Sequence, residues 1–217
     1  PANLTNTGTI SVNSGSTLNL VGSASWTNTG TFRVAGGTLN LVGTLTTAAL
    51  NQPGFVRTGG TVIIKGTLDN SGSTLALADN VHVEGAIIGG TISTSGAAKL
   101  SFSGTLQGVT LAGVAEVAGL SGYVKGGLTL NGGQLIVNAN QLIFEASNQA
   151  LTGNGTVLFV GTGGSLHTEA NRQLTLGAGV IIVATTGTNQ LVATASGASG
   201  VLDSIISTAP GATVLLR

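Results

Sequence analysis

The chain has 217 residues, of which 36 are glycine and 41% are hydrophobic, and it carries seven Lys and Arg against seven Asp and Glu. Without clustered Lys and Arg there is no attraction for nucleic acid or anionic lipid, so we expect neither partner. The absence of cysteine excludes disulfides and thiolate metal sites. No apolar run reaches the ~18 residues of a membrane-spanning helix, so no membrane insertion is expected.

The chain opens at Pro1, contains no methionine and shows no basic segment followed by an apolar one. A secretory signal would have that pattern. We therefore expect a mature part, or a fragment, of a longer protein.

Two short motifs recur about 21 residues apart from the start of the chain. Asn-Thr-Gly-Thr begins at Asn6 and again at Asn28, and Leu-Asn-Leu-Val-Gly begins at Leu18 and again at Leu39. The second motif continues in degenerate form, and its closing glycines are Gly22, Gly43, Gly66, Gly85, Gly104 and Gly126. A repeated unit of this length is the signature of a solenoid, in which each coil covers the next.

Within each repeat, apolar and polar residues alternate, as in Ile10-Ser11-Val12-Asn13. This period of two predicts strands with one buried face, and no segment shows the period of a helix. We therefore predict a right-handed single-stranded parallel β-helix of about ten coils, roughly 21 residues each. A pair of β-sandwich domains is the competing fold, but it would not repeat inner positions at a fixed offset.

The predicted core consists of two inner ladders that run from coil to coil. One ladder contains Leu18, Leu39, Val62, Val81 and Leu100, and the other contains Leu20, Leu41, Ile64, Val83, Phe102 and Val124. The closing glycines are expected to adopt positive φ at the coil corners. Asn6 and Asn28 are expected at equivalent corners, where their amides can bond the backbone of the neighbouring coil.

Beyond residue 126 the alternation continues, but the corner glycines no longer line up. Further inner pairs are expected at Leu142 and Phe144, Val157 and Phe159, and Leu174 and Leu176. We treat residues 1–217 as a single β-solenoid domain with a clear register over 1–126 and a looser one over 127–217.

Acidic residues gather in one part of the chain only, where Asp69, Asp79 and Glu84 fall within one coil and follow Arg57 and Lys65. Polysaccharide-cleaving β-helices use acidic clusters as acid, base or calcium ligands, so these three carboxylates are the only catalytic candidates. The register offers another interpretation for part of the group. Lys65 and Glu84 each precede a closing glycine, which predicts an exposed ion pair between adjacent coils.

Both histidines occur in a His-x-Glu triplet, His82-Val83-Glu84 and His167-Thr168-Glu169. A metal site needs three or four ligands, and the triplets lie about four coils apart. They are better explained as solvated polar positions, so we predict no metal and no cofactor.

Threonines recur in the rows Thr5-x-Thr7-x-Thr9 and Thr27-x-Thr29-x-Thr31. An ice-binding surface would use such an array over more coils, whereas the β-propensity of threonine accounts for a short one. Exposed aromatic residues often contact glycans. Phe32, Phe102, Phe144 and Phe159 have inner-ladder spacing, which leaves Trp26 and Tyr123 as candidate ligand contacts.

The units Asn-x-Gly-Thr-Ile/Phe-x-Val and Gly-x-Leu-x-Leu-x-Gly resemble the repetitive β-helical regions of large bacterial surface proteins. These include filamentous-haemagglutinin-type adhesins and autotransporter passenger domains. The resemblance implies a secreted or cell-surface location, a role as stalk or adhesive scaffold, and partners such as glycans or host-surface components. It carries over no catalytic residue.

The sequence thus favours a non-enzymatic structural or adhesive module. Two alternatives remain open. One is a polysaccharide-processing β-helix, such as a lyase or a phage tailspike. The other is an ice-binding or self-assembling solenoid, which would associate end to end or laterally.

Overall fold

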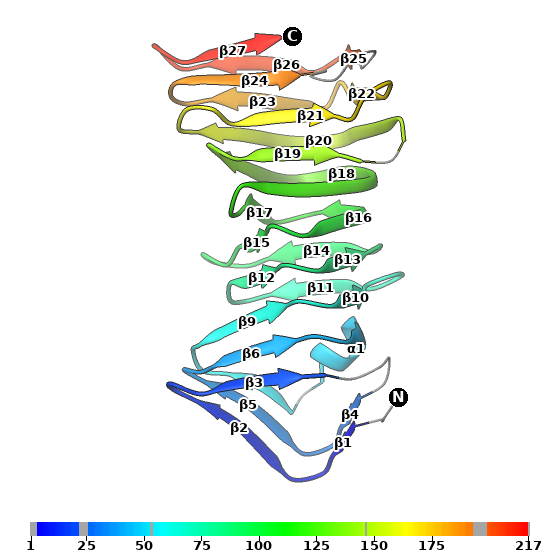
Figure 1. Cartoon of the computed structure of the whole chain (residues 1–217), viewed down its shortest axis with the longest axis vertical. Helices are drawn as coiled ribbons and strands as arrows, with labels where there is room; N and C mark the ends of the chain where they lie inside the picture. Colours follow the sequence, from blue (N-terminus) through cyan, green and yellow to red (C-terminus); the bar gives the residue numbers. More distant parts are fainter. Residues whose placement is uncertain (1–3, 22–25, 53, 146, 193–198, 217) are drawn as a thin grey trace.

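The computed structural model describes residues 4–21, 26–52, 54–145, 147–192 and 199–216, without the side chains of residues 4, 26, 27 and 192. Parallel strands stack into a rod, with the N-terminal coils at one end and the C-terminal coils at the other (Figure 1). The solenoid has about nine turns, roughly 22 residues apart. This confirms the predicted parallel β-solenoid.

From the fourth coil onward the rod has three faces, which we name A, B and C. Face A consists of β3 (Thr17–Leu20), β6 (Thr38–Leu41), β9 (Thr61–Ile64), β12 (Val81–Val83), β15 (Leu100–Phe102), β17 (Val114–Val117), the ends of β18 (Ser121–Asn138) and β20 (Gln149–Val160), β23 (Val180–Ala184) and β26 (Ile205–Thr208).

Face B consists of β7 (Thr44–Thr46), β10 (Thr67–Asp69), β13 (Ala86–Ile88), the starts of β16 (Thr105–Leu111) and β18, β19 (Gln141–Phe144), β21 (Ser165–Thr168), β24 (Thr188–Val192) and β27 (Thr213–Leu216). Face C consists of β11 (Thr74–Leu77), β14 (Thr91–Thr94), the end of β16, the middle of β18, the start of β20, β22 (Gln173–Leu176) and β25 (Ser199–Leu202).

The first three coils have a different cross-section. Their remaining strands are β1 (Leu4–Asn6) and β4 (Trp26–Asn28), which pair with each other, and β2 (Thr9–Asn13), β5 (Thr31–Ala35) and β8 (Phe55–Arg57), which form a sheet of their own. A four-residue helix, α1 (Thr47–Leu50), follows β7. Among the described residues, β8 pairs only with β5 and β11 pairs only with β14, so the stack is interrupted between β8 and β11.

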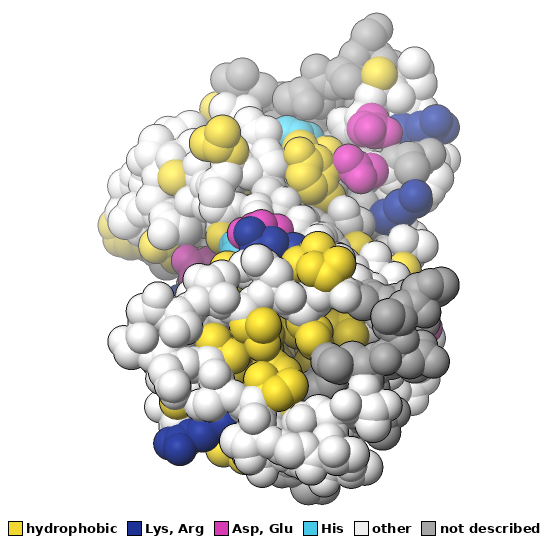
Figure 2. Space-filling model, turned by 60° about the horizontal axis from the view of Figure 1, so that its bottom comes forward, with side chains coloured by type: hydrophobic (Ala, Val, Ile, Leu, Met, Phe, Trp, Pro, Cys, Tyr) yellow, Lys and Arg dark blue, Asp and Glu magenta, His cyan; other side chains and the backbone are white. Residues whose placement is uncertain are grey.

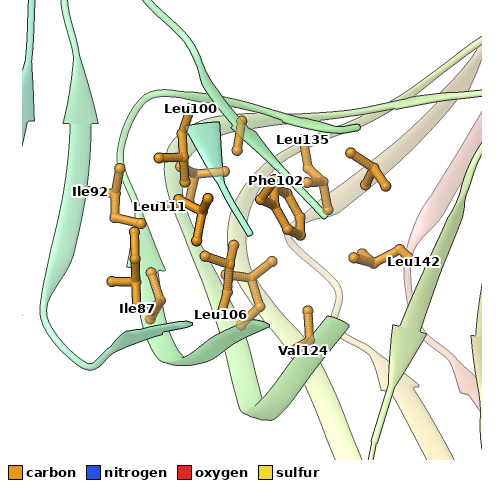
Figure 3. Close-up of a cluster of buried hydrophobic side chains, with 14 of the residues drawn as sticks. Ile87, Ile92, Leu100, Phe102, Leu106, Leu111, Val124, Leu135 and Leu142 are labelled. Atoms are coloured by element: carbon orange, nitrogen blue, oxygen red, sulfur yellow. The ribbon is translucent and has the colours of Figure 1, made fainter. Parts of the chain in front are cut away.

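Inward side chains from the three faces meet along the axis of the rod and form its core. Figure 3 shows Leu100 and Phe102 from face A, Leu106 and Val124 from face B, and Leu111 from face C around one such interior. All five are fully buried. Burial of apolar side chains in a continuous stack supplies the main stabilisation of a chain with so few charges.

The two predicted ladders both lie on face A, and their register is confirmed as far as the fifth coil. Leu18, Leu39, Val62, Val81 and Leu100 pair in sequence, as do Leu20, Leu41, Ile64, Val83 and Phe102. The three later inner pairs are also confirmed as core, because all six side chains are buried. They lie on three different faces, with Leu142 and Phe144 on B, Val157 and Phe159 on A, and Leu174 and Leu176 on C. The chain after residue 126 therefore continues as coils.

The prediction for Val124 is wrong. Phe102 is followed on face A by Val117, whereas Val124 lies on face B between Leu106 and Phe144. The physical reason is one short coil, in which the partner of Leu100 is Ala115, only 15 positions later.

The glycine that stacks on Gly104 is also different from the predicted one, Gly126. The Thr105 N–H donates to the Gly85 carbonyl at 2.8 Å, and one coil later the Tyr123 N–H donates to the Gly104 carbonyl at 3.0 Å. Gly122, rather than Gly126, therefore stands over Gly104.

The expected positive φ is confirmed for Gly126, at 70°, but is wrong for Gly43, Gly66, Gly85 and Gly104, which do not have positive φ. Gly22 lies outside the described residues. A Cβ atom on Gly104 would instead stand 2.0 Å from the carbonyl oxygen of Gly85, and the glycines below are placed in the same way. Glycine is required here because successive backbones come too close for any side chain.

The predicted bond from a corner asparagine to the neighbouring coil is confirmed for Asn6 but not for Asn28, whose Nδ2 is buried without a partner in the described structure. The Asn6 side-chain amide donates to Asn28 Oδ1 at 2.7 Å and to the Thr31 carbonyl at 3.1 Å. A second corner uses Asn70, which is fully buried and whose Nδ2 donates to the carbonyls of Gly89 and Thr91. These amides satisfy backbone groups that the strands leave unpaired at the corners.

Candidate binding face

Face C carries an outward column of five threonines on successive coils, which we name the threonine column. Its members are Thr74, Thr91, Thr110, Thr129 and Thr152. The residues that follow four of them, Leu75, Ile92, Leu111 and Leu130, are buried, so the alternation turns the threonines outward. At ~4.8 Å per coil, the column extends over roughly 19 Å.

The threonine column is surrounded by small and uncharged residues. Two positions further along each strand stand Ala76, Ser93, Ala112, Asn131 and Asn154. Thr129 and Thr152 place their hydroxyl oxygens 3.4 Å apart, whereas Thr110 and Thr175 have no hydrogen-bond partner for their hydroxyls among the described residues. These hydroxyl groups are therefore free to donate to, and accept from, a ligand.

A shallow hollow of about 580 Å³ lies beside the C-terminal half of the threonine column. Its lining includes Thr110, Thr129, Thr152 and Thr175, together with the exposed Asn148, and contains no charged residue. Its volume falls within the usual range of ligand sites. Figure 2, which brings the N-terminal end of the rod forward, shows the Lys, Arg, Asp and Glu side chains of that view separated by wide areas of uncharged surface.

The structure does not bring the three candidate carboxylates together. Asp69 ends β10, Asp79 lies between β11 and β12, and Glu84 follows β12, so each stands at a different corner of one coil. Among the described residues there is no group of three His, Asp or Glu that could hold a metal ion. No two of these three carboxylates share a corner.

Each of these carboxylates has a local partner. Glu84 lies 3.2 Å from the Lys65 ammonium, which confirms the predicted ion pair between coils. Asp69 accepts a hydrogen bond from the Ser71 N–H at 3.0 Å, and its bonds to Ser71 lower its pKa. Asp79 interacts electrostatically with Arg57, whose pKa is lowered by burial and partly restored by that carboxylate.

The histidines lie on different faces, His82 on face A and His167 on face B. His82 Nδ1 is 2.9 Å from the hydroxyl of Ser101 on the next coil. His167 is half-buried, and this burial lowers its pKa. Neither histidine has the surroundings of a metal ligand among the described residues.

Tyr123 is half-buried on the outside of face B, where it lies between Thr105 and Ile143 of the adjacent coils. It is on a different face from the threonine column. The side chain of Trp26 lies outside the described part of the chain. The four aromatic residues predicted in the core, Phe32, Phe102, Phe144 and Phe159, are fully buried, as expected.

The two predicted threonine rows are in register, since Thr5 pairs with Thr27 and Thr9 with Thr31. They do not continue into a third coil, because Gly54 stands over Gly30 there. The longer threonine column of face C was not predicted. Its signal in the sequence is a threonine followed by Leu or Ile at residues 74, 91, 110 and 129, which the corner glycines do not mark.

No helix in the described part of the chain has the length and apolar character needed to cross a bilayer. No protein-family model, curated protein or solved structure matches this chain.

Proposed function

We propose that the chain is a non-enzymatic structural and adhesive module of a secreted or surface-exposed bacterial protein, and that it contacts neutral glycans through the threonine column. The observation that carries this proposal is the uncharged outer surface of face C, where five threonines repeat at the spacing of the coils. A rod with a continuous apolar core also suits a stalk, because each added coil extends it by ~4.8 Å.

Neutral glycans suit this surface for chemical reasons. Each threonine hydroxyl is both a donor and an acceptor, as are the hydroxyls of a sugar. No charge on the lining selects an ionic ligand or repels one. Several weak contacts along one polymer add up, because binding at one coil raises the effective concentration of the polymer at the next.

The test is a panel of neutral and acidic polysaccharides, incubated with the protein with and without calcium, in which both binding and polymer length are followed. We expect binding of neutral polymers without shortening. Replacing Thr110, Thr129 and Thr152 together by valine should weaken binding by about tenfold or more, because three hydrogen bonds of about 0.5–1.5 kcal/mol each are lost. The matched control changes Thr44, Thr67 and Thr105 of face B to valine and should leave binding unchanged.

Shortening of any polymer would contradict a non-enzymatic role and direct mutagenesis to Asp69, Asp79 and Glu84. Equal loss of binding in both triple variants would contradict the assignment to face C. Absence of binding to every polymer would leave the adhesive part of the proposal without support.

A second candidate function is ice binding, and the five-coil threonine column specifically favours it. An evenly spaced array of hydroxyl and methyl groups on an uncharged sheet is the type of surface that such a function requires. Thermal hysteresis in dilute solution, lost in the face C triple variant and kept in the face B variant, would establish it. Absence of hysteresis in the unaltered protein would exclude it.

A further inference from the structure

The interruption of the stack between β8 and β11 leaves an apolar pocket of about 130 Å³ in the side of the rod. Leu50 of α1, Phe55 of β8, Val62 of β9, and Leu75 and Leu77 of β11 line it. The pocket exists because β8 stacks on β5, whereas β11 is the first strand of a new stack. The inward side chains of β8 and β11 are therefore not in register.

The size and lining of the pocket match a small ring. An enclosed cavity of about 150 Å³ lined by Leu, Ile and Phe is large enough to bind benzene. Val62, Leu75 and Leu77 are at least nine-tenths buried, whereas Leu50 and Phe55 are partly exposed. Phe55 is held in place by stacking on Phe32, with ring centroids 5.6 Å apart. The pocket thus has a buried apolar floor and remains open to solvent.

An arginine guanidinium completes the pocket. Arg57 is one of the lining residues, and its two terminal nitrogens donate to the carbonyls of Asn80 and Gly60, at 2.5 and 2.7 Å. Its Nε is buried and has no hydrogen-bond partner in the described structure. Among the described residues no carboxylate lies within 4.0 Å of this guanidinium, although Asp79 also lines the pocket.

We propose that this pocket binds a small aromatic monocarboxylate, with the ring against Leu75 and Leu77 and the carboxylate at Arg57. The apolar floor selects the ring by its size. The buried, unpaired Nε–H of the partly exposed Arg57 selects the carboxylate, because a charge-assisted hydrogen bond there satisfies a donor that has no partner. This site is separate from the threonine column and does not depend on the proposed glycan binding.

The test uses benzoate and benzyl alcohol as probes, with methyl NMR spectra of the protein as the readout. Benzoate should shift the methyl signals of Leu75 and Leu77 in a saturable way. Arg57→Gln should weaken benzoate by about tenfold or more, the lower end of what a hydrogen bond to a charged group contributes, and leave benzyl alcohol within about twofold. Leu50→Phe, which fills the pocket, should abolish both, and Leu120→Phe on the exposed corner after β17 should affect neither.

A measurement on the unaltered protein keeps the proposal testable if Arg57→Gln does not fold. Rising sodium chloride should weaken benzoate and not benzyl alcohol, because only the former relies on charge. The proposal is overturned if neither probe moves the Leu75 and Leu77 methyls, or if Leu50→Phe leaves benzoate binding intact. Equal sensitivity of both probes to salt, or to Arg57→Gln, would refute recognition of the carboxylate.

Discussion

Gly66 lies directly over Gly43, so close that a Cβ atom on Gly66 would stand 2.0 Å from the Gly43 carbonyl oxygen. The same contact recurs for Gly85 over Gly66 and for Gly104 over Gly85. It places four glycines in a line at the corner between faces A and B. The corner is tight because the Ala86 N–H must reach the Gly66 carbonyl at 2.9 Å to continue the stack.

Substitution within this line should therefore be costly even though the change is a single methyl group. Gly85→Ala places its Cβ 1.9 Å from the Gly66 oxygen, and we expect a loss of about 1–3 kcal/mol or more in the free energy of unfolding. The control is Gly8→Ala, because Gly8 has open space around it and no positive φ. That change should stay within about 0.5 kcal/mol. Denaturant unfolding of the two variants measures both, and equal stability would contradict the backbone contact.

Removal of the Asn70 amide should destabilise the fold, because it breaks hydrogen bonds between coils at a buried corner. Its Nδ2 donates to the carbonyls of Gly89 and Thr91, and its Oδ1 accepts from the buried Thr47 hydroxyl at 2.7 Å. Asn70→Ala leaves these groups without partners, at a cost of about 1–3 kcal/mol for each that water cannot reach. Asn131→Ala, at an exposed position, should change stability by less than about 0.5 kcal/mol. Thermal unfolding that ranks the two variants the other way would refute this role.

Acid should destabilise the rod through His167. Burial lowers its pKa below the ordinary value of 6.5, so the unfolded chain binds the proton more tightly than the folded one. The contribution of His167 is therefore complete above about pH 6.5 and is lost as the pH falls toward the lowered pKa of the folded state. Unfolding midpoints between pH 7 and pH 5 should fall less steeply in His167→Gln than in the unaltered protein. An unchanged slope would show that this histidine is not responsible.

The ion pair between Lys65 and Glu84 should contribute little to stability. The nitrogen and oxygen are 3.2 Å apart, but both side chains are about two-fifths exposed. A double-mutant cycle with Lys65→Ala and Glu84→Ala should give a coupling of ~0–1 kcal/mol that shrinks as salt is added. A larger, salt-resistant coupling would mean that the pair is shielded from solvent.

The sequence was sufficient to predict the parallel solenoid and the inner ladders of face A, because buried apolar positions must repeat when identical strands stack. Val62 and Ile64 could be placed from their pattern alone. The same logic failed at Val124, since the ladder was counted from glycine to glycine and the coil between Leu100 and Ala115 is shortened. Corner length varies freely, whereas strand register does not.

Side-chain chemistry at the surface was harder to predict. Asp69, Asp79 and Glu84 are near in sequence, yet a coil of three strands sends them to three corners. The threonine column has the opposite character, because its members are 17 to 23 residues apart in the chain and adjacent in space. The pocket between β8 and β11 exists because β11 does not stack on β8. A periodic pattern in the sequence does not predict such a break.

The missing pairing between β8 and β11 also makes one joint of the rod weaker than the others. Between the third and fourth coils the backbone ladder is continuous through β7–β10 and β9–β12, but it is missing between β8 and β11. In a solenoid each coil is held mainly by its neighbours, so cooperativity passes along the axis one interface at a time. Under a pulling force along the axis, the joint with a missing ladder is where we expect the first three coils to part from the rest, while the remaining coils stay folded as a shorter rod.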